Sequence, residues 1–273
     1  MYYDEDNMFR TLKLLTYHEL LRIKRDRVFW SFAGVALLLL FMTPIVANLS
    51  MRQPAQTGFT LSYSLVHLFL LVLTVFLGTQ ALSRAIERRT LIPVLTLPFS
   101  RSQYLLGAYL ALAIVILVCA LCLDSISLMT SMWLAQFSPI DAGLSVKAML
   151  VAYAMGLTKY LLLLAWALFF SVFSTSFFLP VFGTLGVYIA GSATYQIVEY
   201  LLSNPAEYSQ GFILLVKVLL YILPNFHAFD FQVYAAYGLA VPWMDVIWAL
   251  GYGLTYSTVI LYLATFCFMR REL

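Results

Sequence analysis

The chain has 273 residues, of which 63% are apolar and 11% are charged, with a net charge of +3. Soluble domains contain about 45–50% apolar and about 25% charged residues, so this composition excludes an ordinary soluble domain. The small net charge gives no information about nucleic-acid binding, and we expect no nucleic-acid partner. The three cysteines all lie in apolar stretches, which predicts no disulfide framework.

Apolar runs recur along the chain, and each is long enough to cross a hydrocarbon core of about 30 Å as a helix. Backbone polar groups in lipid must pair within their own segment, which favours helices over strands. The sequence therefore predicts an all-α integral membrane protein in contact with lipid. We expect six transmembrane helices, at about 28–49, 61–82, 104–134, 148–173, 177–202 and 245–268.

The segment before the first span combines apolar and basic residues. Residues 9–27 have the spacing of an amphipathic elbow helix that lies in the membrane interface. The alternative is a solvated basic leader that only fixes topology. The apolar run begins at Val28 with no small-residue cleavage site after it, so we expect an uncleaved first span. We therefore divide the chain into a cytoplasmic segment, 1–27, and one transmembrane domain, 28–273.

A charged break, 83–107, separates the second and third predicted spans. It is the only long interruption of the apolar first half that has clustered charge, and prolines at Pro93 and Pro98 divide it. Such a loop is either a passive connector or a docking surface for a cytoplasmic partner. Its charged residues are Arg84, Glu87, Arg88, Arg89 and Arg101.

Lysine and arginine are distributed unevenly between the two sides of the predicted bundle. With the amino terminus inside, twelve of the sixteen lie on the inner face. The positive-inside rule therefore predicts that both termini and loop 83–107 are cytoplasmic, and that segment 203–244 faces outward. Within that outer segment, the apolar stretch 211–223 is too short to span, which predicts a short re-entrant or interfacial helix.

Charged residues lie in the interior of the third and fourth predicted spans. A charge deep in the bilayer costs roughly 2.5–3.5 kcal/mol on insertion scales, so such residues are usually paired or functional. We hypothesise that Asp124 and Lys159 form a pair or face a shared polar cavity. The alternative is that each one snorkels or meets its own water.

The fifth predicted span is rich in small and polar residues, which let helices approach closely. These residues either line a transport pathway or a dimer interface, or simply pack. They are Gly183, Gly186, Gly191, Ser192, Thr194 and Glu199.

Motifs of nucleotide, metal and redox sites are missing or incomplete. No lysine follows a glycine, so the phosphate-binding G-x-x-x-x-G-K-[ST] loop is absent and any ATPase must be another chain. The sequence from His18 to Arg22 begins like a zinc-protease helix but lacks the second histidine, so we expect no metal site. Cys119 and Cys122 have C-x-x-C spacing inside an apolar run, where packing is favoured over redox function. We expect no catalytic residue and no enzyme activity in this chain.

The charged loop resembles a signature of exporter-type permeases, the second permease class of the ATP-binding-cassette (ABC) superfamily. The similar segment reads IERRTLIPVLTLPFSRSQYLLGAYL, and its matching residues are Glu87, Thr90, Leu91, Leu97, Pro98, Ser100, Arg101 and Gly107. Further similarity lies in HELLRIKRDRVFW, FSTSFFLPVFGTLG, LYILPNFHAFDF and FCFMRREL, in the same order along the chain.

The resemblance implies a six-span permease of the bacterial cytoplasmic (inner) membrane that exports a substrate by alternating access. Two copies, or this chain and a homologous permease, would form the pore. A separate ABC subunit, docked beneath each permease subunit, would bind ATP and Mg. This chain itself would bind no cofactor. Loop 83–107 would be the coupling helix. Its contacts with the ATPase would be charged at Glu87, Arg88 and Arg89, and apolar at Leu91, Ile92 and Leu95.

Two competing functions remain open from the sequence. One is a membrane-embedded redox or cofactor protein built on Cys119, Cys122 and His67. The other is an ion-coupled secondary transporter that uses Asp124 and Lys159.

Overall fold

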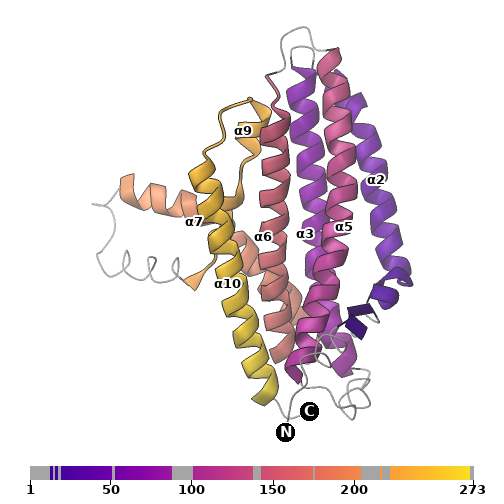
Figure 1. Cartoon of the computed structure of the whole chain (residues 1–273), viewed down its shortest axis with the longest axis vertical. Coiled ribbons are helices and arrows are strands. Elements are labelled where there is room, and N and C mark those ends of the chain that lie inside the picture. The colour runs from indigo at the N-terminus through magenta and orange to yellow at the C-terminus, as the bar shows by residue number, and fades with distance from the viewer. Residues whose placement is uncertain are drawn as a thin grey trace.

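The computed structural model describes residues 13–14, 16–17, 20–50, 53–87, 101–137, 143–174, 176–203, 216 and 222–270. Throughout these residues the regular structure is helical, without a strand. Five helices are long and apolar enough to cross a membrane, so the chain is a multi-pass membrane protein (Figure 1). They are α2 (Arg27–Asn48), α3 (Pro54–Glu87), α5 (Arg101–Gln136), α6 (Val146–Phe173) and α10 (Trp243–Arg270).

These five helices lie where five of the six apolar runs predict them. The largest difference is in α3, which begins at Pro54 rather than near Leu61. Its first turns contain Gln56 and Thr57, which interrupt the apolar run but are compatible with a helix. The lengths of the apolar runs therefore predict the positions of these helices well, but they predict the residues at which the helices begin and end less well.

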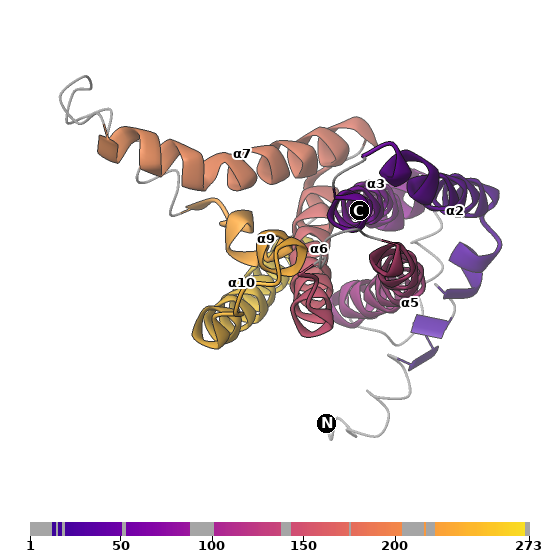
Figure 2. The ribbon, with the colours of Figure 1, turned by 90° about the horizontal axis from the view of Figure 1, so that it is seen from above.

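Helix α6 is the centre of the bundle. Every residue from Leu162 to Leu168 is at most 8% exposed, so this stretch is buried on all sides. Viewed along the bundle, α6 is surrounded by α3, α5, α10 and α7 (Figure 2), and it contacts each of them. A helix buried all round is apolar all round, which is the pattern of this stretch.

Close approach between α3 and α6 depends on small residues and on polar contacts. A Cβ atom at Gly78 would lie 2.6 Å from the Cβ of Ala167, so the two backbones meet there only because Gly78 has no side chain. Higher in the bundle, the Tyr63 hydroxyl donates to the Ala152 carbonyl oxygen at 3.4 Å. Ser171 donates to carbonyl oxygens of α3 at Gly78 and Thr79, each at 3.4 Å.

Helix α7 (Phe178–Ser203) begins beside α6 and is steeply inclined to the other long helices, so that it projects away from the bundle (Figures 1 and 2). It corresponds to the predicted fifth span. Its continuous apolar helical stretch among the described residues is Phe178–Ala193. On its outward face, the side chains of Phe182 and Ile189 are 68% and 66% exposed.

The chain returns from α7 through a compact segment that sequence reasoning missed. It consists of a 3-10 turn, η1 (Phe226–Phe229), and a short helix, α9 (Gln232–Ala236). Phe226, Phe229 and Phe231 are at most 4% exposed, because this segment packs against α6, α7 and α3. The predicted outer helix at 211–223 lies almost entirely outside the described residues.

The described part of the amino-terminal segment packs at the lower end of the bundle in Figure 1. Residues 20–24 are helical, and the Ile23 side chain is 4% exposed. Thr16 donates to the carbonyl oxygen of Gly107 on α5 at 3.4 Å, and the Trp30 indole donates to the Lys24 carbonyl oxygen at 2.8 Å. The segment before α2 is thereby tied to the start of α5.

Candidate functional site

The charged loop leaves the bundle at the end of α3 and returns at the start of α5. Helix α3 ends at Glu87 and α5 begins at Arg101. The five other predicted partner-binding residues, Arg88, Arg89, Leu91, Ile92 and Leu95, lie outside the described residues, as does the side chain of Glu87. The described part of the loop is therefore its two helical ends.

Arg101 anchors the returning end of the loop to the last turn of α10. Its guanidinium Nη1 donates to the carbonyl oxygens of Phe268 at 3.4 Å and Met269 at 3.5 Å. The final carbonyls of a helix lack intrahelical donors and carry partial negative charge, so a cation is favourable there. Arg101, a residue of the exporter-like signature, thus joins α5 to α10.

An apolar cluster reinforces this junction. Tyr104 and Leu105 of α5 pack with Val172 of α6 and with Ala264 and Phe268 of α10, all at most 7% exposed. Three helices are therefore packed together directly above the point where the loop returns. These contacts join the start of α5 to α6 and to the end of α10.

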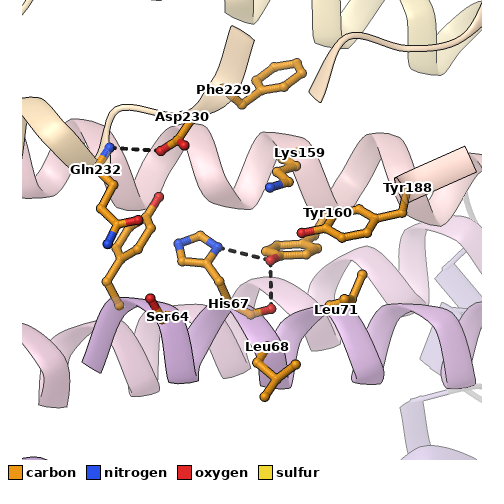
Figure 3. Close-up of a pocket in the computed structure, with 11 residues that line it drawn as sticks. Ser64, His67, Leu68, Leu71, Lys159, Tyr160, Tyr188, Phe229, Asp230 and Gln232 are labelled. Atoms are coloured by element: carbon orange, nitrogen blue, oxygen red, sulfur yellow. Dashed lines mark hydrogen bonds between the residues drawn. The ribbon is translucent and has the colours of Figure 1, made fainter. Parts of the chain in front are cut away.

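A cavity of about 290 Å³ lies between α3, α6, α7 and the η1–α9 segment (Figure 3). Its α3 wall includes Tyr63, His67 and Leu68, and its α6 wall includes Lys159 and Tyr160. Tyr188 of α7 and the short stretch Phe229, Asp230 and Gln232 complete it. His67 and Lys159 lie near the middle of α3 and α6, and the lining residues Ser64, Leu68 and Asp230 are exposed, so the cavity lies midway along these helices and opens at the surface of the bundle.

His67 and Tyr160 form a fixed pair across the floor of the cavity. The Tyr160 hydroxyl donates to the His67 carbonyl oxygen at 2.7 Å, and the same hydroxyl lies 3.2 Å from His67 Nδ1 (Figure 3). Because the hydroxyl has one proton, we assign the second contact to Nδ1–H donating to the hydroxyl oxygen. His67 Nε2 is then an acceptor, and it has no hydrogen-bond partner among the described residues.

Gly156 of α6 allows this histidine to fit. A Cβ atom at Gly156 would overlap Cε1 of the His67 ring and lie 2.8 Å from its Nε2. The other face of the histidine contacts Tyr63, with the two ring centroids 3.9 Å apart. The ring is therefore held between Tyr63, Tyr160 and the backbone of α6.

Lys159 is the fixed positive charge of the cavity. Its Nζ lies 5.0 Å from the centroid of the Tyr188 ring and 5.9 Å from that of Tyr160. Aromatic faces attract a cation, which offsets part of the cost of removing it from water. No carboxylate in the described part of the chain forms an ion pair with it.

A second polar cluster lies on the α5 side of α3. Ser127 bonds to Ser62 at 2.7 Å and to the Tyr153 hydroxyl at 2.9 Å, linking α5 to α3 and α6. Asp124 lies one turn before Ser127, and its Oδ1 is buried without a hydrogen-bond partner among the described residues.

Asp124 and Lys159 therefore belong to different polar clusters. No ion pair joins them in the ranges that the structure describes, and Asp124 is not part of the cavity that Lys159 lines. The hypothesis that the two charges act together stays a prediction.

The small residues of α7 divide between two faces. Gly183 packs on the Phe170 ring, 3.1 Å from where its Cβ would be, and a Cβ at Gly191 would overlap the Pro224 carbonyl oxygen. Gly186 has no atom within 4 Å of that position, so it faces outward with Phe182 and Ile189. Ser192 Oγ is buried and has no partner in the described part of the chain. The side chains of Thr194 and Glu199 lie outside it.

The residues of the proposed redox site, Cys119, Cys122 and His67, lie in different environments. Cys122 is exposed on α5 and Cys119 is half-buried, while His67 bonds to Tyr160. Among the described residues, no three histidine, cysteine or carboxylate side chains lie close enough together to bind a metal ion.

Sequence reasoning identified Lys159 and His67 but missed the aromatic residues around them. Tyr63 and His67 are four residues apart on α3, and Lys159 and Tyr160 are adjacent on α6. Polar residues at i and i+4 in an apolar run lie on one helical face, and this spacing was the available signal. Asp230 and Gln232 come from the η1–α9 segment, whose return to α6 no local pattern predicts.

Comparison with known protein families gives one match. A family model described as ABC-2 family transporter protein matches residues 15–191, more than half of the chain. The matched region includes α2, α3, α5, α6 and the first half of α7, and with them the charged loop and most of the cavity wall. A search of curated proteins finds no match.

Proposed function

The chain belongs to the ABC-2 family of transporter proteins, and from this premise we propose that it is the permease subunit of an ABC exporter. A separate ATP-binding subunit supplies the energy and binds ATP and Mg, and this chain moves the substrate by alternating access. The observation that supports this mechanism most directly is the anchoring of the charged loop to two transmembrane helices through Arg101 and its apolar cluster.

Loop 83–107 is the coupling element in this proposal. Glu87, Arg88 and Arg89 form charge-assisted contacts with the ATPase, and Leu91, Ile92 and Leu95 provide an apolar ridge. Motion of the ATPase reaches Arg101 at the end of the loop. Because Arg101 contacts the last turn of α10, the movement is transmitted to α5 and α10 together.

A second permease subunit completes the membrane part, either another copy of this chain or a homologous permease. Helix α7 projects from the bundle with large apolar side chains exposed on its outward face, and Gly186 at the centre of that face allows close approach of another helix. In this assembly α7 is the sixth membrane span and Glu199 lies near its outer end. The pathway between the subunits is lined partly by this face.

The topology follows from the same proposal. Both termini and the coupling loop are cytoplasmic in the inner membrane of a bacterium, and segment 203–244 faces outward. The amino-terminal segment 1–27 lies along the inner membrane surface as an elbow helix, tied to α5 by the contact of Thr16 with Gly107. Residues 28–273 form one transmembrane domain in contact with lipid.

Co-purification of an ATPase tests the proposal. Tagged chain expressed at native level should retain an ATP-binding subunit, and the Glu87→Ala/Arg88→Ala/Arg89→Ala variant should lose it. A matched control is Arg25→Ala/Asp26→Ala/Arg27→Ala, which also removes one acidic and two basic residues but leaves the loop unchanged. Full ATP-dependent transport by the loop variant would refute the coupling assignment.

A further inference from the structure

The cavity contains two opposite fixed charges that do not neutralise each other. Lys159 and Asp230 both line it, and no ion pair links them in the described structure. Asp230 Oδ1 accepts a hydrogen bond from the backbone N–H of Gln232 at 3.2 Å, which fixes the position of the carboxylate (Figure 3). A ligand that satisfies both sites must therefore have a negative and a positive group.

The walls of the cavity differ around the two charges. Lys159 lies over the rings of Tyr160 and Tyr188, so those two faces are already used by a cation. Tyr63 and Phe229 line the cavity together with Asp230, and the Tyr63 ring is packed on His67 with the two centroids 3.9 Å apart. This side therefore offers the Asp230 carboxylate, with which an ammonium group can form a charge-assisted contact.

The volume limits the ligand to a small polar group. Sites for drug-sized molecules have volumes of about 300–1,000 Å³, and this cavity of about 290 Å³ is just below that range. Leu68 and Leu71 line the same cavity, and Leu68 is 56% exposed on the surface of α3. A molecule whose headgroup fills the cavity can therefore extend an apolar chain along α3.

We propose that this cavity binds the zwitterionic headgroup of a lipid-like amphiphile. Its anionic group contacts Lys159, and its ammonium group contacts the Asp230 carboxylate. This inference names the substrate class of the exporter and in that respect rests on the proposed function, while the binding itself requires neither ATP nor a partner subunit.

Binding of short-chain lipids to the purified full-length chain in non-ionic detergent tests the proposal. The probes are dihexanoyl phosphatidylethanolamine, which is zwitterionic, and dihexanoyl phosphatidylglycerol, which is anionic only. Wild type should bind the zwitterionic lipid more tightly. Lys159→Met should weaken binding of both lipids about tenfold or more, as expected for loss of a charge-assisted contact. Asp230→Asn should weaken binding of phosphatidylethanolamine alone.

Two matched control residues lie outside the cavity. Lys147→Met removes an exposed lysine from the start of α6, and Asp245→Asn removes an exposed carboxylate from the start of α10. Both should bind the two lipids as wild type does. Lys159→Arg keeps the charge and should retain binding, which separates loss of charge from loss of fold.

Equal affinity of wild type for the two lipids, or unchanged affinity after Lys159→Met, would overturn the headgroup assignment. The proposed function fails by a different result, namely the absence of an ATPase that depends on loop 83–107. A chain that retains this ATPase but binds neither lipid at the cavity would overturn only the present inference.

Discussion

Replacing Gly156 by alanine tests whether the contact between α3 and α6 sets the shape of the cavity. The new methyl group would overlap the His67 ring, which is 3.1 Å away at Nδ1 and closer at Cε1 and Nε2. The ring cannot swing aside freely, because it bonds to Tyr160 and stacks on Tyr63. Either the two helices move apart or the histidine loses these contacts.

The expected loss of stability follows from three contributions. Overpacking costs about 1–3 kcal/mol, and loss of the hydrogen bond between His67 and Tyr160 costs about 1 kcal/mol. Alanine is better than glycine in a helix by about 1 kcal/mol, which offsets part of this loss. We therefore expect the Gly156→Ala chain to be less stable by about 1–3 kcal/mol.

Thermal unfolding in detergent, followed by tryptophan fluorescence, measures this change. Gly251→Ala is the matched control, because no atom lies within 4 Å of its Cβ position, and it should be neutral or slightly stabilising. In a His67→Ala background the space is open, so Gly156→Ala should cost nothing further. If Gly156→Ala has the same cost with and without the histidine ring, the steric argument is wrong.

Three further changes test separate parts of the structure. Arg101→Ala should speed hydrogen exchange in the last turn of α10, measured by mass spectrometry, because that turn loses its cap; unchanged exchange would contradict the anchor. Ser127→Ala should cost about 1 kcal/mol in thermal unfolding, because it removes two interhelical bonds, whereas the exposed Ser125→Ala should cost nearly nothing. Cys122→Ala should leave stability and transport unchanged, since the thiol is exposed; lost transport would favour a redox function.

The sequence predicted the helices because length and apolarity are sufficient to recognise a span. It did not predict which helix is central. Lipid and protein core are both apolar, so the lipid-facing residues of α2 and the fully buried residues 162–168 of α6 look alike in the sequence. The direction of α7 was hidden for the same reason, because an apolar helix can pack on its own chain or on another.

The candidate site was only partly predictable. Lys159 was recognised because charge is costly in lipid, but its partners are tyrosine rings, which are common in membrane proteins and give little signal. Asp230 was missed because it reaches the cavity through the η1–α9 segment, a contact between residues distant in sequence. Whether Asp124 and Lys159 act together stays a prediction, because sequence position gives the depth of a charge along its helix but not the face on which it lies.

The central position of α6 has a consequence for how the protein is made. The helices that precede it, α2, α3 and α5, have a higher mean hydropathy in their most apolar stretch than α6 and α10 do. They are therefore better suited to enter a bilayer alone. Helix α6, with its charged Lys159, emerges from the ribosome after α3 and α5 but before α7 and α10, which also pack on it. The order of synthesis therefore brings α6 to two of its neighbours first, and its burial is complete only when α7 and α10 have followed.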